Sequence, residues 1–127
     1  MPFFTDVKFI NNTNNHDLGS GSIAIYDALS YIDYSVTLTV TNCVFEANHG
    51  INNGAIGLQG VSLTVKDSIF TKNTMKYGSS ISFNAYKRTA DSRDSVLTIN
   101  NCTFSENDSD YGVMDVYIYW QSTDPPL

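Results

Sequence analysis

The sequence predicts an all-β chain folded as a single-stranded parallel β-helix of about four coils, in one domain spanning residues 1–127. Three observations support this prediction. A short motif occurs four times, a second motif follows each occurrence, and extra residues enter at one fixed point of the repeat. A chain that repeats short strands in this way forms a solenoid, in which each coil packs only on its neighbours.

The first motif is a Phe followed three residues later by an Asn. A small residue stands two positions before the Phe, and Asp or Asn, which favour turns, stands three positions before it. In the last three copies, Leu-Thr-Val or Leu-Thr-Ile ends five positions before the Phe. The four motifs are Phe9–Asn12, Phe45–Asn48, Phe70–Asn73 and Phe104–Asn107.

The second motif opens with small residues, after which apolar residues alternate with others, at 21–25, 54–58, 79–83 and 112–116. A period of two residues predicts a short strand with one face buried. Each coil therefore has about three strands, and the coils begin near residues 1, 36, 61 and 95. The extra residues follow the second motif as inserted loops at 26–37 and 84–96.

Stacked coils lie about 4.8 Å apart, so equivalent residues form columns. We expect the Phe, Leu and Val or Ile columns to point inward, the Thr column outward, and the Asn column to form an amide ladder at a corner. Cys43 and Cys102 share one column with Ser68 between them, which puts them about 9.6 Å apart. A disulfide spans at most ~7 Å between Cα atoms, so we expect two free, buried thiols.

The chain has a net charge of −6, with 13 Asp and Glu against 7 Lys and Arg. A nucleic-acid-binding domain needs a basic patch, so no nucleic-acid partner is expected. No apolar run approaches the ~18 residues of a membrane-spanning helix, so no membrane insertion is expected, and the first residues lack a signal-peptide pattern. Three Asn residues fit the N-glycosylation pattern, which applies on a secretory route: Asn11, Asn101 and Asn107.

Two copies combine Phe-x-x-Asn with a following small-small-Ile block, at residues 45–48 with 53–56 and at residues 70–73 with 78–81. These blocks resemble the repeats of chlamydial polymorphic outer-membrane proteins and of archaeal and bacterial adhesin-like surface proteins. The resemblance covers roughly residues 4–118 and implies a right-handed β-helix of the pectate-lyase type, placed outside the cell or on its surface. We therefore expect a non-catalytic module, adhesin-like or structural, which stacks end to end into a filament or belongs to a longer β-helix.

A carbohydrate-active enzyme, either a polysaccharide lyase or a glycosidase, is the alternative, because such enzymes use this fold. A glycosidase needs two carboxylates about 5–9 Å apart, and Asp108, Asp110 and Asp115 are the acids that offer a pair. A lyase needs a basic cluster beside a cation site, and the nearest basic cluster contains Lys87 and Arg88. These residues lie among turn formers and loop charges, so we assign no catalytic residue, cofactor or metal.

Two surfaces are expected to contact partners. Both inserted loops leave the solenoid at one corner, where tyrosines suit contact with a protein or glycan of a host or neighbouring surface. The residues of this face are Tyr26, Tyr31, Tyr34, Tyr86, Lys87 and Arg88. The two ends of the solenoid expose unpaired strand edges. The aromatic residues that we expect to stack there are Phe3, Phe4, Tyr117, Tyr119 and Trp120.

Overall fold

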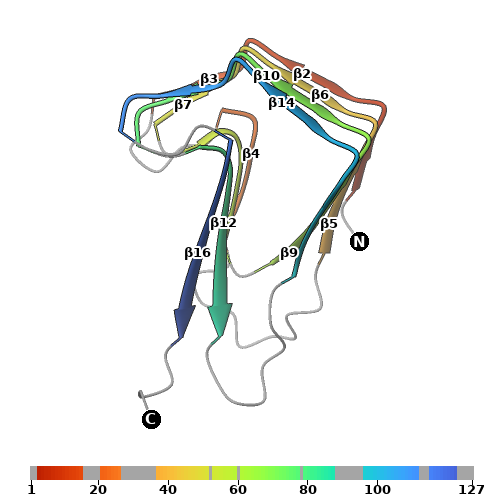
Figure 1. Ribbon diagram of the computed structural model, residues 1–127, viewed down its shortest axis with the longest axis vertical. Coiled ribbons are helices and arrows are strands. Elements are labelled where there is room, and N and C mark those ends of the chain that lie inside the picture. Colours follow the sequence, from red (N-terminus) through yellow and green to blue (C-terminus); the bar gives the residue numbers. More distant parts are fainter. Residues whose placement is uncertain are drawn as a thin grey trace.

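The computed structural model describes residues 3–15, 21–26, 37–51, 53–59, 61–77, 79–87, 96–111 and 115–122. All strands in these ranges pair in parallel, and they form four sheets of four strands each. Each successive coil adds one strand to every sheet, so the chain is a parallel β-helix of about four coils, as the repeat predicted. Figure 1 looks along the stack, and equivalent strands of successive coils nearly overlap in it.

The four sheets follow one another around the coil. The first contains β1 (Phe3–Thr5), β5 (Thr37–Thr41), β9 (Ser62–Lys66) and β13 (Leu97–Asn100). The second contains β2 (Lys8–Ile10), β6 (Val44–Glu46), β10 (Ile69–Thr71) and β14 (Thr103–Ser105). The third contains β3 (Thr13–Asn14), β7 (His49–Gly50), β11 (Thr74–Met75) and β15 (Asp108–Ser109). The fourth contains β4 (Ile23–Tyr26), β8 (Asn53–Gln59), β12 (Ser79–Lys87) and β16 (Val116–Ser122).

Each coil has four strands, where the sequence pattern predicted about three, because two corners with left-handed backbone interrupt it. At the first corner φ lies between 52° and 58°, at Asp6, Asn42, Asp67 and Asn101, the turn formers of the repeat. At the second corner φ lies between 54° and 57°, at Asn11, Ala47, Lys72 and Glu106. This second corner separates the second sheet from the two-residue strands of the third.

The fourth strand of the third coil is longer than the alternating motif indicated. The motif predicts that this strand ends at Phe83 and that an inserted loop begins at residue 84. In the structure β12 continues to Lys87, and its last residues pair with β16 in the register Asn84 to Tyr119 through Lys87 to Ser122. Pairing with the last coil thus holds four residues of the expected loop as strand.

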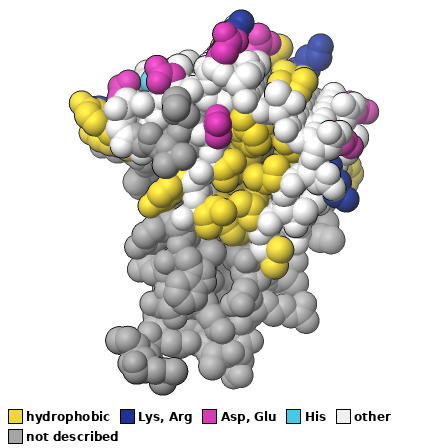
Figure 2. Space-filling view, in the orientation of Figure 1, with side chains coloured by type: hydrophobic (Ala, Val, Ile, Leu, Met, Phe, Trp, Pro, Cys, Tyr) yellow, Lys and Arg dark blue, Asp and Glu magenta, His cyan; other side chains and the backbone are white. Residues whose placement is uncertain are grey.

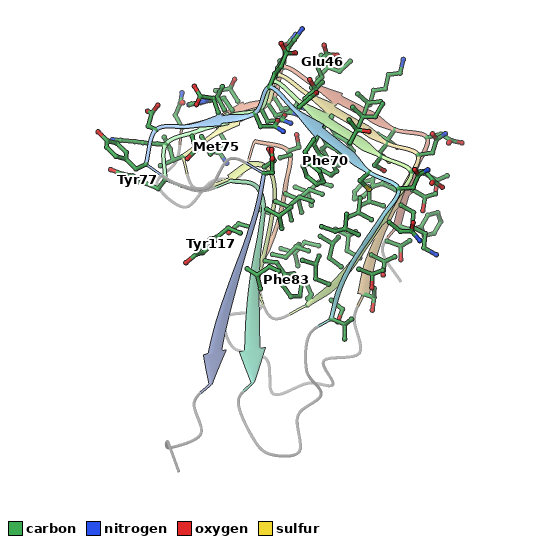
Figure 3. The ribbon with its side chains drawn as sticks, viewed as in Figure 1. Glu46, Phe70, Met75, Tyr77, Phe83 and Tyr117 are labelled. Atoms are coloured by element: carbon green, nitrogen blue, oxygen red, sulfur yellow. The ribbon has the colours of Figure 1, made fainter. Side chains whose placement is uncertain are left out.

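The core consists of side chains that stack coil over coil. The Phe rings lie parallel, with centroids 4.7, 4.6 and 4.8 Å apart along the column. Phe45 and Phe70 are fully buried within it. The other inward columns hold aliphatic residues in matching register, for example Leu38, Leu63 and Leu97. Figure 3 shows Phe70 and Phe83 pointing into the interior of the coil.

The two cysteines lie in one column, on either side of Ser68, and both thiols are free. Cys43 is buried, as expected. Cys102 is only half-buried, which corrects the expectation of two buried thiols. The reason is its place in the last coil that the described residues form, where a neighbouring coil covers the column on one side and not on the other.

Candidate contact surfaces

A ladder of carboxamides runs through the four coils at the second corner. In each step, the Asn Oδ1 of one coil accepts hydrogen bonds from both the backbone N–H and the Nδ2 of the Asn one coil earlier, at 3.0–3.1 Å. From the second coil onward, the Nδ2 also donates to the carbonyl oxygen of the preceding coil's Phe. The ladder consists of Asn12, Asn48, Asn73 and Asn107, and the last three are buried.

The ladder ends on a carboxylate. Asn107 donates from Nδ2 to Asp115 Oδ1 at 3.2 Å, in the direction in which the earlier rungs donate to the next Asn. Asp115 immediately precedes Val116, which pairs with Ile81. Asp115 therefore supplies the acceptor that a further rung would supply, and it places a negative charge beside the open end of the core.

The end formed by β13 to β16 exposes apolar side chains. Ile118 is 59% exposed, whereas Phe83, its neighbour one coil below, is buried. Ile99 is 37% exposed, and its neighbour Val65 is fully buried. Figure 2, which looks onto this end, shows hydrophobic side chains gathered between the described walls of the coil. The inward residues of the last coil are Leu97, Ile99, Cys102, Phe104, Val116 and Ile118.

The opposite end, formed by β1 to β4, is open in the same way. Phe4 and Phe9 pack edge to face, with ring centroids 5.4 Å apart, and both are only half-buried. Val7 and Ile25 are half-buried beside them, although their column neighbours Cys43 and Leu58 are buried. At both ends, therefore, side chains that belong to the core columns are partly exposed to solvent.

The aromatic residues expected to stack at the ends do not act as one group. Phe4 points inward, but Phe3 pairs with Thr39 in the outward column and is exposed. Tyr117 also points outward from β16 (Figure 3). The side chains of Tyr119 and Trp120 lie outside the described residues. Among the described residues, most of the inward side chains at the two ends are aliphatic, and the repeat columns were the sequence signal that identified them.

The side chains of the expected loop face all lie outside the described residues, so this face stays a prediction. Tyr31, Tyr34 and Arg88 lie outside the described residues, and so do the side chains of Tyr26, Tyr86 and Lys87. The backbone places Tyr26 in register with Gln59 of β8, which pairs with Asn84 of β12. Tyr26 and Tyr86 therefore belong to different columns of the fourth sheet.

A different pair of tyrosines forms an exposed aromatic surface beside the third sheet. Tyr77 and Tyr111 stack with ring centroids 5.6 Å apart, and they are 54% and 75% exposed. Lys76 Nζ lies 5.1 Å from the centre of the Tyr77 ring. A hydrogen bond with Tyr77, together with the nearby phenol and acid groups, raises the pKa of the Lys76 ammonium. We call Lys76, Tyr77 and Tyr111 the tyrosine surface; the repeat gives no signal for it, because Tyr77 and Tyr111 lie between the Asn of the first motif and the small residues of the second.

The three glycosylation triplets differ in how accessible their Asn side chains are. Asn11 and Asn101 are exposed at the two corners of the coil. Asn107 is 6% exposed, and its Nδ2, the atom to which a glycan would be joined, already donates two hydrogen bonds. Glycosylation of Asn107 would require opening the end of the Asn ladder.

The acids named for the enzyme alternative lie in the last coil, between the start of β15 and the start of β16. Asp108 and Asp110 are exposed, and Asp115 is the partner of Asn107. Within the described ranges, no group of three or more His, Cys, Asp or Glu side chains is placed to hold a metal ion. None of the described segments forms a helix long and apolar enough to cross a membrane.

Comparison of the chain with protein-family models, with curated proteins and with solved structures finds no match in any of the three. The functional argument therefore rests on the repeat and on the geometry of the surfaces described above.

Proposed function

We propose that this chain is a non-catalytic, extracellular or cell-surface β-helix module, adhesin-like or structural, that presents its flank to a partner and associates end to end. The observation that carries the proposal is the unbroken set of inward columns, which joins the coils into one stack with two open ends. The resemblance of the repeat to those of adhesin-like surface proteins supports the same function, and it supports a right-handed coil. The exposed sequons at Asn11 and Asn101 agree with a secretory route.

The tyrosine surface supports contact with a protein or glycan of a host or neighbouring surface. Exposed tyrosines offer large, amphipathic contact area with few rotatable bonds. The outer ring face of such a residue packs against apolar C–H groups, while its hydroxyl donates and accepts hydrogen bonds. Lys76 adds a fixed positive charge beside the ring of Tyr77.

Binding of the whole chain to a glycan array and to immobilised extracellular-matrix proteins tests this function. The natural chain and Tyr117→Ser, an exposed tyrosine outside the tyrosine surface, are expected to bind equally. The double variant Tyr77→Ser with Tyr111→Ser is expected to lose at least about tenfold in affinity, as is typical for truncated aromatic contact residues. Equal binding by all three proteins contradicts the tyrosine surface as the contact site.

Incubation with polysaccharides separates the module from the enzyme alternative. The natural chain is expected to leave acidic and neutral polysaccharides uncleaved, as measured by the release of reducing ends and of unsaturated sugars. Cleavage that is lost in Asp108→Asn or Asp110→Asn would favour the glycosidase or lyase instead.

A further inference from the structure

The apolar residues at the two ends of the solenoid are exposed only because of their position in the stack. The same columns are closed in the two middle coils, where each side chain lies between an equivalent residue above and below. A cover that pairs with the strand edges at β13–β16 repeats the spacing of the coil beneath it. The end at β1–β4 of the same chain has that spacing, because it pairs with the second coil in the same register.

We propose that a second copy of this chain covers this end, head to tail, so that β1–β4 of one copy extend the four sheets beyond β13–β16 of another. We call this contact between two copies the joint. Parallel pairing of the exposed strand edges supplies its main-chain hydrogen bonds. Successive copies are then related by a shift of four coils, about 19 Å at ~4.8 Å per coil. This proposal rests on the proposed function, and it specifies which strands and residues pair in the end-to-end association.

The Asn ladder continues through this joint. Asn12 of the second copy stacks on Asn107 of the first, with its Oδ1 toward the Asn107 backbone N–H as in the earlier steps. The Asn107 Nδ2, which in those steps also donates to the next Asn, keeps Asp115 as its acceptor. The Nδ2 of Asn12 donates to the carbonyl oxygen of Phe104, just as Asn48 donates to that of Phe9 at 2.9 Å. The half-open Phe column closes in the same step, when Phe9 covers Phe104.

The charges of the two ends agree with this register. Asp and Asn alternate at the first corner, where Asn42 donates to Asp6, and Asn101 donates to Asp67 at 2.7 Å. A head-to-tail joint places Asp6 after Asn101, so the alternation continues and no two carboxylates become neighbours. Three further charged residues of the two edges meet uncharged ones across the joint: Lys8 meets Thr103, Glu106 meets Asn11, and Asp108 meets Thr13.

A buried hydroxyl without a partner gives the second, independent argument. Among the described residues, Ser22 Oγ is the buried side-chain polar atom that has no hydrogen-bond partner. Ser22 precedes Ile23 in the first coil, and Asp115 precedes Val116 in the last, at the same position of the repeat. The joint therefore brings the Ser22 hydroxyl of one copy onto the Asp115 carboxylate of another. There the Asp115 carboxylate, which already accepts from Asn107, offers an acceptor that the Ser22 hydroxyl reaches by rotating toward the joint.

Sedimentation of the whole chain over a range of concentrations tests the joint. The natural chain is expected to grow in mass with concentration. Ile118→Lys places a charge on the exposed end of the core, and it is expected to stay monomeric. Ile69→Lys is the matched control, since Ile69 is the same residue type and is 43% exposed, but lies on the outer face of a middle coil. Natural chain that stays monomeric at millimolar concentration, or association that Ile118→Lys leaves unchanged, overturns the proposal.

Ser22→Ala separates the joint from a general effect on folding. Removing a hydroxyl that lacks a partner is expected to leave the unfolding midpoint of the monomer unchanged or to raise it. The same change is expected to weaken association by about tenfold, since it removes a hydrogen bond to a charged group. In an Asp115→Ala background, Ser22→Ala is expected to have no further effect on association. Equal weakening in both backgrounds overturns the contact between these residues.

Disulfide trapping tests the register without depending on the strength of association. In a chain with Cys43→Ser and Cys102→Ser, Ile10→Cys with Ser105→Cys is expected to form chains of linked copies on oxidation. Residues 10 and 105 are three coils apart within one copy, too far for a disulfide, but adjacent across the joint. Ile10→Cys with Thr71→Cys is the control, since these two positions are adjacent neither within one copy nor across the joint. Equal linking in both proteins overturns the register.

The outcomes also distinguish the joint from the proposed function. A monomeric chain that binds a glycan or protein through the tyrosine surface overturns the joint and leaves the adhesin-like module standing. A chain that associates in the trapped register but binds no ligand supports the joint and the structural role, and it contradicts the adhesin-like role.

Discussion

The backbone N–H of Cys43 donates to Ser68 Oγ, one coil further on, at 3.1 Å. Ser68 Oγ in turn donates to its own strand, to the carbonyl oxygen of Lys66, at 2.8 Å. The two cysteines repeat this second contact, with Cys43 Sγ 3.3 Å from Thr41 O and Cys102 Sγ 3.4 Å from Asn100 O. Serine and cysteine thus play one role in the column, closing the first corner from inside the coil.

Cys43→Ser and Cys102→Ser are therefore expected to change stability little, by less than about 1 kcal/mol each. The serine hydroxyl makes the hydrogen bond that the thiol makes. The exchange loses only part of the stabilisation that the buried, apolar sulfur contributes. Urea unfolding of both variants against the natural chain measures this. A loss of several kcal/mol in either variant would show that the sulfur fills a space that oxygen does not.

The two free thiols are expected to react at different rates with a thiol-specific reagent under native conditions. Cys102 is half-buried beneath the open end, so it reacts first. Cys43 is buried between neighbouring coils and reacts only when the coil opens, so urea accelerates its reaction much more. Mass spectrometry of peptides from the partly modified chain assigns the two rates. Faster modification of Cys43 would contradict the order of the coils in the column.

Asn73→Ala is expected to destabilise the chain by about 3–5 kcal/mol, because several buried groups lose their partners at once. The Asn48 backbone N–H and Nδ2 lose their acceptor, and the Phe45 carbonyl loses its donor. Asn12→Ala is the control at the exposed first rung, with an expected loss below about 1 kcal/mol. Thermal or urea unfolding compares the two, and similar losses would contradict the ladder as a source of stability.

Ala47→Gly is expected to stabilise the chain by about 0.5–1 kcal/mol, because a residue with a Cβ pays for left-handed backbone and glycine does not. Ala47 has φ of 56° at the second corner. Ala55→Gly is the matched control in β8, where Ala55 is fully buried, and there the same change is expected to destabilise by about 1 kcal/mol. If both variants were destabilised, the second corner would not carry the strain that its backbone indicates.

The columns of the solenoid were predictable because parallel stacking demands the same residue type at the same place in every coil. Phe9, Phe45, Phe70 and Phe104 pair in the register that the repeat predicts. Asp and Asn identified the first corner, since both residues tolerate left-handed backbone. The second corner carries Ala47, Lys72 and Glu106, which give no such signal, so the number of strands per coil was underestimated.

The surfaces were less predictable than the core. Aromatic residues near the chain ends suggested end-stacking, but alternation along the strand turns Phe3 and Tyr117 outward and leaves Ile99 and Ile118 to form the open end. The stack of Tyr77 on Tyr111 joins residues 34 positions apart, and it depends on how the third and fourth coils superimpose.

The sequence by itself determined that the chain is a parallel β-helix, which columns it stacks and which residues fill its core, because a repeat fixes what each coil places on the next. Only the tertiary structure decided how the stack ends. Asp115 terminates the Asn ladder, Ser22 Oγ is buried without a partner, and both inward faces stay open. These features depend on which residue has no neighbour above or below it, and a repeat pattern, which describes what coils share, does not contain that information.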